Sequence, residues 1–515
     1  MHIFGSNPLR AFNNHRAKAA ALATVIGLIV LSLVAIESNK TVAPTKLAGY
    51  YAQQLKWKTC YETFKCSELL VPVDYSDLKV GTMKISVLKY SAQEQKKKLG
   101  SIVVNPGGPG GSGVDYAYNA EYLFSPDILD RYDIVGFDPR GVARSAPITC
   151  FNGEETDANY AADTKPDNQS ELDTSVADSK AFIAKCQERT KYLEYYSTAN
   201  AARDMDLLRA ALGDDHLNYM GKSYGTYMGT LYAQLFPDKV GRMVLDGAVD
   251  PSISDFQSIK AQAVGFDLAL DAFIKDCEKD IDCPLPNNPD EAKTFILNLY
   301  HSAATTPLPQ RKPNRGDDRV ATESLLVIGT ASALYDSVDG WPQLRQAFTE
   351  AKDGYSDAFM KLVDQYTGRQ ADGTYADNEF DAGAVIDCLD FKDPRSIDQM
   401  TADVPAMTEA APIFGPYLAY ANLTCAFFPQ PKNKTAVKSS IATTNPMIVI
   451  GTTRDPATPY EWSVALHKIL TNSKLLTYNG DGHTGQGRGN ACIDDAVDAY
   501  YLRGTLPKTG LSCTE

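Results

Sequence analysis

Gly221-Lys222-Ser223-Tyr224-Gly225 is the stretch of this sequence that decides the fold. A Gly-x-Ser-x-Gly run between an apolar strand and a helix is typical of a nucleophile elbow, a sharp turn that holds a serine in strained backbone dihedrals while the glycines let neighbouring backbone pass. Residues 216–220 are predicted to form the strand, and residues 226–236 an amphipathic helix that ends before Pro237. The stretch therefore predicts that Ser223 is a nucleophile.

A histidine that could activate this serine occurs late in the chain. When the catalytic groups follow the chain order serine, acid, histidine, the histidine comes after a late strand. His483 fits this order, because it lies in a glycine-rich loop directly after the apolar run 474–478. The alternative is a surface loop histidine without a catalytic role. The other five of the six histidines precede the elbow or fall in predicted helices: His2, His15, His216, His301 and His467.

Asp455 is the candidate acid, because it follows the predicted strand 446–451 in an Asp-Pro loop. Its carboxylate would accept a hydrogen bond from Nδ1 of His483, fix the tautomer and stabilise the imidazolium. The alternative is a turn that caps a helix beginning near Pro459. Asp481 is a second candidate acid, although it stands too close to His483 in the sequence for the usual separate-strand arrangement.

Acyl transfer also needs donors for the developing oxyanion, and a glycine-rich run supplies them. The predicted strand 101–104 leads into residues 105–113, Asn-Pro-Gly-Gly-Pro-Gly-Gly-Ser-Gly. We expect the backbone N–H groups of Gly108 and Tyr224 to form the oxyanion hole. Nucleotide binding is not predicted, since the run has neither a Gly-Lys-Ser/Thr ending nor a Gly-x-Gly-x-x-Gly pattern that opens a helix with an acid downstream. The predicted chemistry needs no cofactor.

These motifs resemble the secreted tripeptidyl aminopeptidase group of α/β-hydrolases, which is related to the prolyl aminopeptidases. The resemblance extends over roughly residues 46–515, and it implies an exopeptidase that removes a short peptide, a tripeptide above all, or a proline-containing unit from a free N-terminus. The segments that carry it are residues 105–113, Phe137-Asp138-Pro139-Arg140-Gly141, the Ser223 elbow, the loops of Asp455 and His483, residues 66–75 and residues 501–513.

Two departures from the family pattern are visible. Prolyl aminopeptidases carry His-Gly-Gly-Pro-Gly where this chain has Pro106 in place of the histidine, which argues against plain proline release. Residues 425–429, Cys-Ala-Phe-Phe-Pro, are similar to a Cys-x-x-Trp-Pro segment of the family, with phenylalanine replacing tryptophan.

The pattern along the chain predicts an α/β-hydrolase core, with a mostly parallel sheet of the eight-stranded type flanked by helices, and a large helical lid insertion. Five strands are expected before Pro251 and two after a long gap, at residues 80–90, 101–104, 132–137, 217–220, 242–245, 445–451 and 474–478. Helices are expected in the gap at residues 256–279, 290–303 and 343–367. The expected division is an N-terminal segment at 1–44, the first part of the core at 45–250, the lid at 251–440 and the last part of the core, with the acid and the histidine, at 441–515.

The N-terminus and the charge indicate the compartment. Residues 19–36 are an uncharged apolar run behind basic residues, and as a helix they would rise ~27 Å, close to the thickness of a bilayer core. The run is either a signal peptide or a retained anchor that attaches the protein to a membrane, and both place the catalytic part outside the cytoplasm. The net charge of −14 argues against a nucleic-acid partner. Nothing in the sequence specifies an oligomeric state.

The even number of cysteines favours complete disulfide pairing in an exported chain. Sequential pairing is the simplest scheme, although other connectivities stay open. A zinc site is not predicted, because no Cys-x-x-Cys pair occurs and histidines are sparse. The ten cysteines are Cys60, Cys66, Cys150, Cys186, Cys277, Cys283, Cys388, Cys425, Cys492 and Cys513.

Substrate specificity is the least predictable feature. An aminopeptidase needs a carboxylate that pairs with the substrate ammonium. We expect Asp138 and Arg140 to form a structural pair that braces the oxyanion loop. An esterase or lipase with the same triad is the alternative within enzymes, and a non-catalytic binding module with a hydrolase fold is the alternative outside them. Five acids of and around the lid are expected to be solvated surface groups rather than amine ligands: Glu154, Glu155, Glu379, Asp387 and Asp390.

Overall fold

The computed structural model describes residues 44–312, 317–390, 395–429 and 435–514. The apolar run 19–36, predicted as a signal peptide or anchor, lies outside the described residues. Within the described ranges, no helix combines the length and the apolar character needed to cross a membrane.

A mixed sheet of ten strands forms the centre of the molecule, in the order β1-β2-β3-β5-β4-β6-β7-β8-β9-β10. The strands from β5 to β10 run parallel, whereas β2 pairs antiparallel with its neighbours β1 and β3, and β3 with β5. Their bounds are β1 Lys58–Cys60, β2 Phe64–Pro72, β3 Thr82–Tyr90, β4 Gly100–Asn105, β5 Tyr132–Phe137, β6 Leu217–Lys222, β7 Val240–Asp246, β8 Met447–Arg454, β9 Ser473–Asp481 and β10 Ser512–Thr514.

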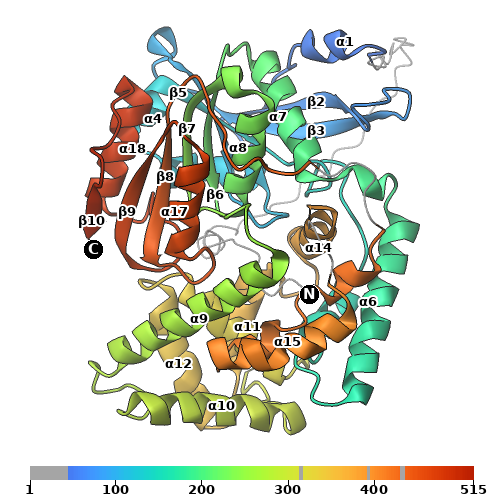
Figure 1. The fold of residues 1–515 in the computed structure, drawn as a ribbon, viewed down its shortest axis with the longest axis vertical. Helices are drawn as coiled ribbons and strands as arrows, with labels where there is room; N and C mark the ends of the chain where they lie inside the picture. The colour runs from blue at the N-terminus through green and yellow to red at the C-terminus, as the bar shows by residue number, and fades with distance from the viewer. Residues whose placement is uncertain (1–43, 313–316, 391–394, 430–434, 515) are drawn as a thin grey trace, which may run out of the picture.

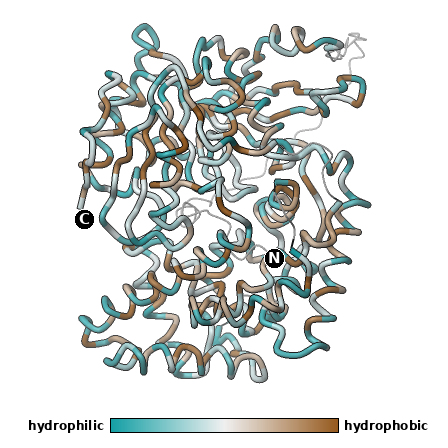
Figure 2. The backbone as a smooth tube through the Cα atoms, viewed as in Figure 1, coloured by the Kyte–Doolittle hydropathy of each residue, from teal (hydrophilic) through white to brown (hydrophobic). Residues whose placement is uncertain are grey.

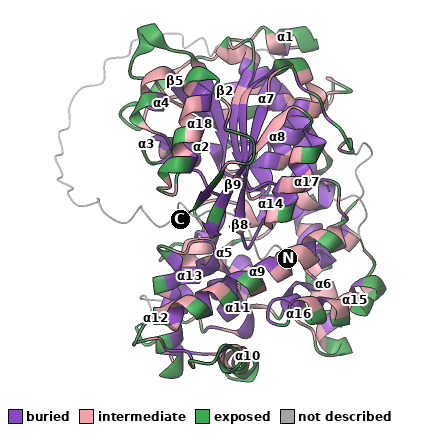
Figure 3. Cartoon of the chain, turned by 60° about the vertical axis from the view of Figure 1, so that its left-hand side comes forward, coloured by how far each residue is buried: buried purple, intermediate pink, exposed green. Residues whose placement is uncertain are grey.

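Helices cover both faces of this sheet, and its central strands are buried as a result (Figure 3). Each face carries its own apolar cluster, as expected for a parallel sheet covered on both sides. One face packs against α7 (Thr198–Leu212), α8 (Tyr224–Leu235) and α17 (Tyr460–Ile469), and the other against α2 (Gly113–Tyr118), α4 (Pro126–Arg131) and α18 (Ala491–Arg503). Strand order and helical layers confirm the predicted α/β-hydrolase fold.

A helical region, which we call the cap, is inserted between β7 and β8 and lies beside one end of the sheet (Figure 1). It encloses a third apolar cluster of its own. Hydrophobic and hydrophilic residues alternate along its helices (Figure 2), which is typical of helices that bury one face. The cap helices are α9 Asp255–Cys277, α10 Pro289–Thr305, α11 Glu323–Leu334, α12 Gly340–Lys352, α13 Asp357–Thr367, α14 Glu379–Asp390, α15 Ile397–Ala410, α16 Gly415–Leu418 and η5 Leu423–Phe427.

Three local features differ from the expectation. The helix expected over residues 343–367 is two helices, α12 and α13, because Gly354 adopts a φ of 85° between them. The short edge strands β1 and β10, and the longer β2, were not predicted as strands. Two helices assigned to the core by sequence, α5 (Gly153–Ala161) and α6 (Gln169–Arg189), contribute Tyr160 and Leu172 to the buried cluster of the cap.

Five disulfides join the cysteines, and they are the sequential pairs. The pairs 60–66 and 277–283 close short loops. The pair 388–425 joins α14 to η5 within the cap, the pair 150–186 joins the loop after β5 to α6, and the pair 492–513 joins α18 to the edge strand β10. The pairs are Cys60–Cys66, Cys150–Cys186, Cys277–Cys283, Cys388–Cys425 and Cys492–Cys513.

Candidate active site

Ser223 occupies the turn between β6 and α8, with φ 54° and ψ −126°. Both glycines of the stretch are required by close packing: a Cβ on Gly221 would stand 2.5 Å from the carbonyl oxygen of Gly225, and one on Gly225 would stand 2.7 Å from Oδ1 of Asn105. The Ser223 N–H donates to the carbonyl of Asp246 on the neighbouring strand, at 2.9 Å. This is the strained geometry of a nucleophile elbow.

Asp455 and His483 follow the carboxyl ends of β8 and β9, and their side chains are in contact at this edge of the sheet. Nδ1 of His483 lies 2.9 Å and 3.0 Å from the two carboxylate oxygens of Asp455. Both side chains are almost fully buried, at 2% exposed each. Nε2 of His483 is buried without a hydrogen-bond partner in the described part of the chain, so the hydrogen bonds that hold the ring are those at Nδ1.

The Asp455 carboxylate is oriented by further donors of its own loop. It accepts the N–H groups of Ala457 and Thr458, at 2.9 Å and 2.8 Å, and the hydroxyl of Thr458, at 2.9 Å. The turn expected as an alternative therefore exists and coexists with the histidine contact. The second candidate acid, Asp481, binds the guanidinium of Arg454 and not the imidazole.

The glycine-rich run 105–113 follows β4 and reaches the same edge of the sheet. Gly108 and Tyr224, the expected oxyanion donors, line one cavity together with Ser223. Gly108 has a φ of 112°, a region open to glycine, and a Cβ there would stand 2.7 Å from the backbone nitrogen of Gly110. The run thus turns tightly beside Ser223, and its role as an oxyanion hole stays a prediction.

The prediction that Asp138 and Arg140 pair with each other is wrong, because each binds a different partner. Asp138 does brace the oxyanion loop, since it accepts the hydroxyl of Ser112 and binds the Arg144 guanidinium at 3.1 Å. Arg140 instead forms a buried two-point ion pair with Asp204, with both contacts at 2.7 Å. The carboxylate of Asp138 is already bound by Ser112 and Arg144, whereas the Arg140 guanidinium is also held by the carbonyls of Pro72 and Val73 beside Asp204.

The cavity over Ser223 is enclosed by the elbow, the oxyanion loop, the start of α9, α14 and the segment around Leu418. Four aspartates line it, and none of its described lining residues is basic. These acids are Asp250, Asp255, Asp387 and Asp390.

Asp387 and Asp390 were expected to be solvated surface acids, and the structure corrects this. They stand three residues apart on α14 and so share one face of that helix, which lines the cavity. Asp390 also accepts the backbone N–H of Thr198, at 3.1 Å, at the start of α7. Asp250 and Asp255 were not singled out by sequence, since nothing in their spacing distinguishes them from turn and helix-start acids.

Of the remaining acids of that group, Glu154 is exposed, whereas Glu155 and Glu379 serve the structure around the site. Glu155 closes the capping box of α5 and binds Lys185 and Arg189. Glu379, at the start of α14, packs against the oxyanion loop, where a Cβ on Gly110 would stand 2.6 Å from its carbonyl oxygen. The described residues contain no group of three or more His, Cys, Asp or Glu side chains that could hold a metal ion.

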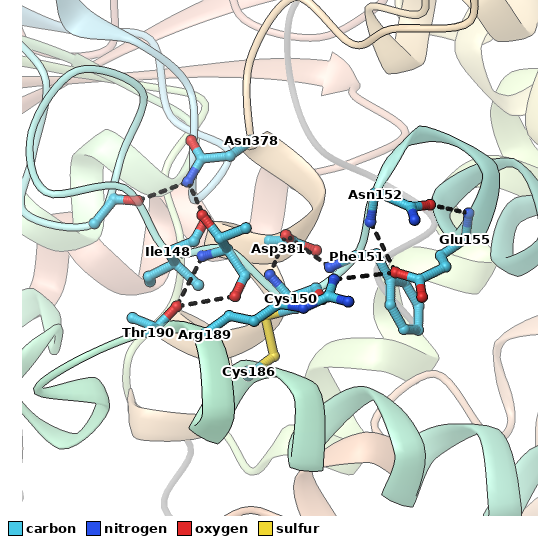
Figure 4. Close-up of a disulfide and its surroundings, with 12 residues drawn as sticks. Ile148, Cys150, Phe151, Asn152, Glu155, Cys186, Arg189, Thr190, Asn378 and Asp381 are labelled. Carbon is cyan, nitrogen blue, oxygen red and sulfur yellow. Dashed lines mark hydrogen bonds and ion pairs between the residues drawn. A yellow bond between two sulfur atoms is a disulfide. The ribbon is translucent and has the colours of Figure 1, made fainter.

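The start of α14 is fastened to the loop that follows β5 (Figure 4). Asn378 donates to the carbonyls of Gly141 and Ile148, both at 2.8 Å. Asp381 accepts the N–H groups of Cys150 and Phe151, at 2.6 Å and 3.2 Å. At the other end, the Cys388–Cys425 disulfide ties α14 to η5. The helix that carries two cavity acids is therefore fixed at both ends.

Comparison with known proteins agrees with this architecture. Residues 411–513 match the family described as TAP-like protein. The chain is 34% identical to serine protease Hip1 of Mycobacterium tuberculosis, over 96% of each chain. The chain belongs to the TAP-like family of α/β-hydrolases.

Other relatives of this TAP-like chain carry different names. It is 37% identical to carboxylesterase B of Mycobacterium tuberculosis, over 90% of this chain and 91% of that one. It is 30% identical to tripeptidyl aminopeptidase of Streptomyces lividans, over 89% of this chain and 86% of that one. The protein is a serine hydrolase.

Proposed function

We propose that this TAP-like protein is an extracytoplasmic serine exopeptidase that releases short peptides, tripeptides in particular, from free N-termini. The observation that carries the proposal is the single cavity that joins Ser223 to four aspartates, with no basic side chain among the described residues that line it. A cavity of this charge favours a cationic substrate group, and a peptide with a free N-terminus carries one next to the chain to be cleaved.

The chemistry is acyl transfer through Ser223. His483 Nε2, buried and without another partner in the described chain, accepts the proton as Ser223 Oγ attacks the scissile carbonyl. Asp455 holds the Nδ1–H and stabilises the imidazolium. The amides of Gly108 and Tyr224 bind the oxyanion, the imidazolium then protonates the leaving amine, and water releases the peptide from the acyl-enzyme by the same route.

The substrate ammonium is assigned to the cavity face of α14. Asp387 and Asp390 present two carboxylates on one helix face, and the helix is fixed at both ends, so the distance between these acids and Ser223 is constant. A fixed distance selects the length of the unit between the ammonium and the scissile carbonyl. This arrangement supports an exopeptidase that releases peptides of a set length.

The extracytoplasmic location is supported by the disulfides. Five disulfides form among the described residues, and such a set persists in oxidising compartments. The pairs Cys277–Cys283 and Cys388–Cys425 fix the ends of α9 and α14, two helices that line the cavity. The shape of the cavity therefore depends on oxidised cysteines.

The test is hydrolysis of chromogenic amides that carry one, two or three residues, each with a free and an acetylated N-terminus. We expect preference for the free tripeptide and complete loss in Ser223→Ala. Asp387→Asn should raise KM for free-amine substrates about tenfold or more, the cost of one charge-assisted hydrogen bond, and leave acetylated substrates unchanged. Asp282→Asn, at an exposed cap acid outside the cavity, is the matched control. Equal turnover of free and acetylated peptides would contradict the amine assignment.

A carboxylesterase is the second candidate, favoured by the 37% identity to carboxylesterase B. The same triad would act on an ester, and only the cavity separates the two activities. Ser223-dependent turnover of a short-chain ester without amide cleavage would establish it. Absence of any Ser223-dependent turnover would favour a non-catalytic binding module instead.

A further inference from the structure

The cap touches the predicted catalytic histidine directly, through Tyr335. This residue follows α11, and its carbonyl oxygen accepts the backbone N–H of His483 at 2.9 Å. Its ring meets the imidazole edge to face, with centroids 5.2 Å apart and an interplanar angle of 87°. A cap residue therefore contacts both the backbone and the ring of His483.

The turn that begins at Tyr335 docks on the whole histidine loop. Asp336 lies 3.5 Å from the Arg488 guanidinium, which in turn donates to the carbonyl of Asp481 at 2.8 Å. Gly482, with φ 97°, has no room for a side chain, because a Cβ there would stand 2.8 Å from the Tyr335 carbonyl oxygen. The turn at Tyr335 and the loop of His483 are in close contact, so even a small separation would break these contacts.

Tyr335 is fixed from the cap side as well. It is 4% exposed, and its ring packs against Phe266 and Tyr366, with centroids 5.7 Å and 5.9 Å away. The same residue lines the cavity over Ser223. It thus contacts the substrate cavity on one side and the imidazole on the other.

We infer that Tyr335 is a positioning residue for His483, and that the catalytic pair is competent only with the cap seated on the histidine loop. The inference rests on the proposed function of His483 as the base. Asp455 holds the imidazole at Nδ1, a contact that by itself would still allow the ring and its loop to tilt. The Tyr335 ring, which packs on the imidazole, and the Tyr335 carbonyl, which binds the backbone N–H, prevent this tilt. The cap consequently does not open at this turn during turnover, and substrate enters the cavity past its other walls.

The test separates the positioning of His483 from the shape of the cavity. Diisopropyl fluorophosphate reacts with an activated serine and needs His483 but none of the peptide subsites. Tyr335→Ala should slow this reaction and peptide hydrolysis alike, by about tenfold to a hundredfold. Tyr335→Phe, which keeps ring and backbone, should stay within about threefold. Leu418→Ala, which shortens a buried cap side chain in the cavity wall that does not touch His483, should slow peptide hydrolysis and leave the fluorophosphate reaction of the folded protein unchanged.

A spectroscopic signature completes the test. The downfield NMR resonance of the His483 Nδ1–H should broaden or shift in Tyr335→Ala and persist in Tyr335→Phe and Leu418→Ala. A Tyr335→Ala protein that is folded by thermal melting and reacts with the fluorophosphate at the wild-type rate overturns the inference. Tyr335→Leu replaces it if the alanine variant does not fold. A wild-type protein that reacts with the fluorophosphate but cleaves no peptide refutes the proposed substrate and leaves this comparison valid.

Discussion

Lys222 precedes Ser223, the proposed nucleophile, yet its side chain contacts the loop of His483. Its buried Nζ donates to the carbonyl of Gln486 at 2.5 Å and lies 3.9 Å from the carboxylate of Asp246. Asp246, fully buried, accepts the N–H groups of Gly485 and Gln486 at 2.9 Å each. The elbow and the His483 loop are therefore joined by a buried ion pair and its hydrogen bonds, which a single substitution would leave uncompensated.

Replacing Lys222 by methionine should lower kcat/KM about tenfold or more, because the histidine loop loses one anchor. Burial lowers the pKa of the Lys222 ammonium, and the charged groups that face it are Asp246, Asp494 and Arg488. Burial already raises the pKa of Asp246, and without the ammonium this pKa should rise further, which weakens the hold of its carboxylate on the N–H groups of Gly485 and Gln486. The measurement is kcat/KM with a free tripeptide amide.

The double variant Lys222→Met/Asp246→Asn is the control for this prediction, since it removes both charges and keeps the shape of the site. It should recover part of the lost kcat/KM, because no uncompensated buried charge remains. A Lys222→Met protein that keeps the wild-type kcat/KM would show that this anchor of the histidine loop does not affect turnover.

At the scale of elements, α14 connects most parts of the site. It carries Asp387 and Asp390, packs against the oxyanion loop through Glu379 and is held at its far end by the Cys388–Cys425 disulfide. Because each of these contacts comes from a different segment of the chain, a small shift of one helix would change both the shape of the cavity and the proposed site for the substrate amine.

Removing this disulfide with Cys388→Ser/Cys425→Ser should destabilise the protein by about 3 kcal/mol, since it closes a loop with a sequence separation of 37. It should also raise KM for tripeptide amides, because the end of α14 that carries the acids becomes less constrained. The reaction of Ser223 with diisopropyl fluorophosphate should be unchanged. Thermal melting and the two kinetic assays measure these effects separately.

Cys492→Ser/Cys513→Ser provides a matched comparison, because that disulfide joins α18 to the sheet edge, outside the residues that line the cavity. It should lower stability by a similar amount and leave KM unchanged. A KM that rises equally in both double variants would attribute the effect to general loss of stability and contradict the role assigned to α14.

The elements also show which parts of the site were predictable. Ser223, Asp455 and His483 lie in loops directly after strands, so local pattern and chain order were enough to bring them to one edge of the sheet. Asp387 and Asp390 look like ordinary surface acids in the sequence, because their orientation depends on packing between α14, α7 and η5. The same holds for Tyr335, whose contact with His483 joins segments that lie far apart in the chain.

The fold followed the same rule. Strands of the parallel centre were predictable from continuous apolar runs, whereas β1 and β10 are three-residue edge strands without such a run. The break between α12 and α13 depends on one glycine with positive φ, and the amphipathic pattern continues through it. Helix α6 packs against both parts, since Leu172 joins the cluster of the cap whereas Phe182 and Ile183 join the cluster of the core, and a sequence pattern does not identify the partner of a buried face.

At the scale of the whole molecule, the chain is acidic, with a net charge of −14, and some of its carboxyls are buried in the cap and at its border. Desolvation raises the pKa of Asp381 to about 6, although the N–H groups of Cys150 and Phe151 and the charge of Arg189 act in the opposite direction. Desolvation also raises the pKa of Asp267 to about 6. These groups make stability depend on pH in a direction opposite to that of ordinary salt-bridged carboxyls.

We expect stability to increase as the pH falls from 7 to about 4.5, because the folded protein binds protons at Asp381 and Asp267 that the unfolded chain, with carboxyl pKa values near 4, does not yet bind. The gain from Asp381, which is 6% exposed, amounts to at most about 3 kcal/mol for a shift of about two units; it is fully present below about pH 4 and is lost as the pH rises through 6. Carboxyls with lowered pKa, such as Asp317 at about 2, lose their contribution to stability only at more acidic pH.

Thermal melting between pH 4.5 and 7 measures the combined effect of these carboxyls on stability. The variant Asp381→Asn keeps an oxygen acceptor for the N–H groups of Cys150 and Phe151, and it should make stability depend less on pH. An unchanged slope in this variant would show that Asp381 does not carry the pH dependence.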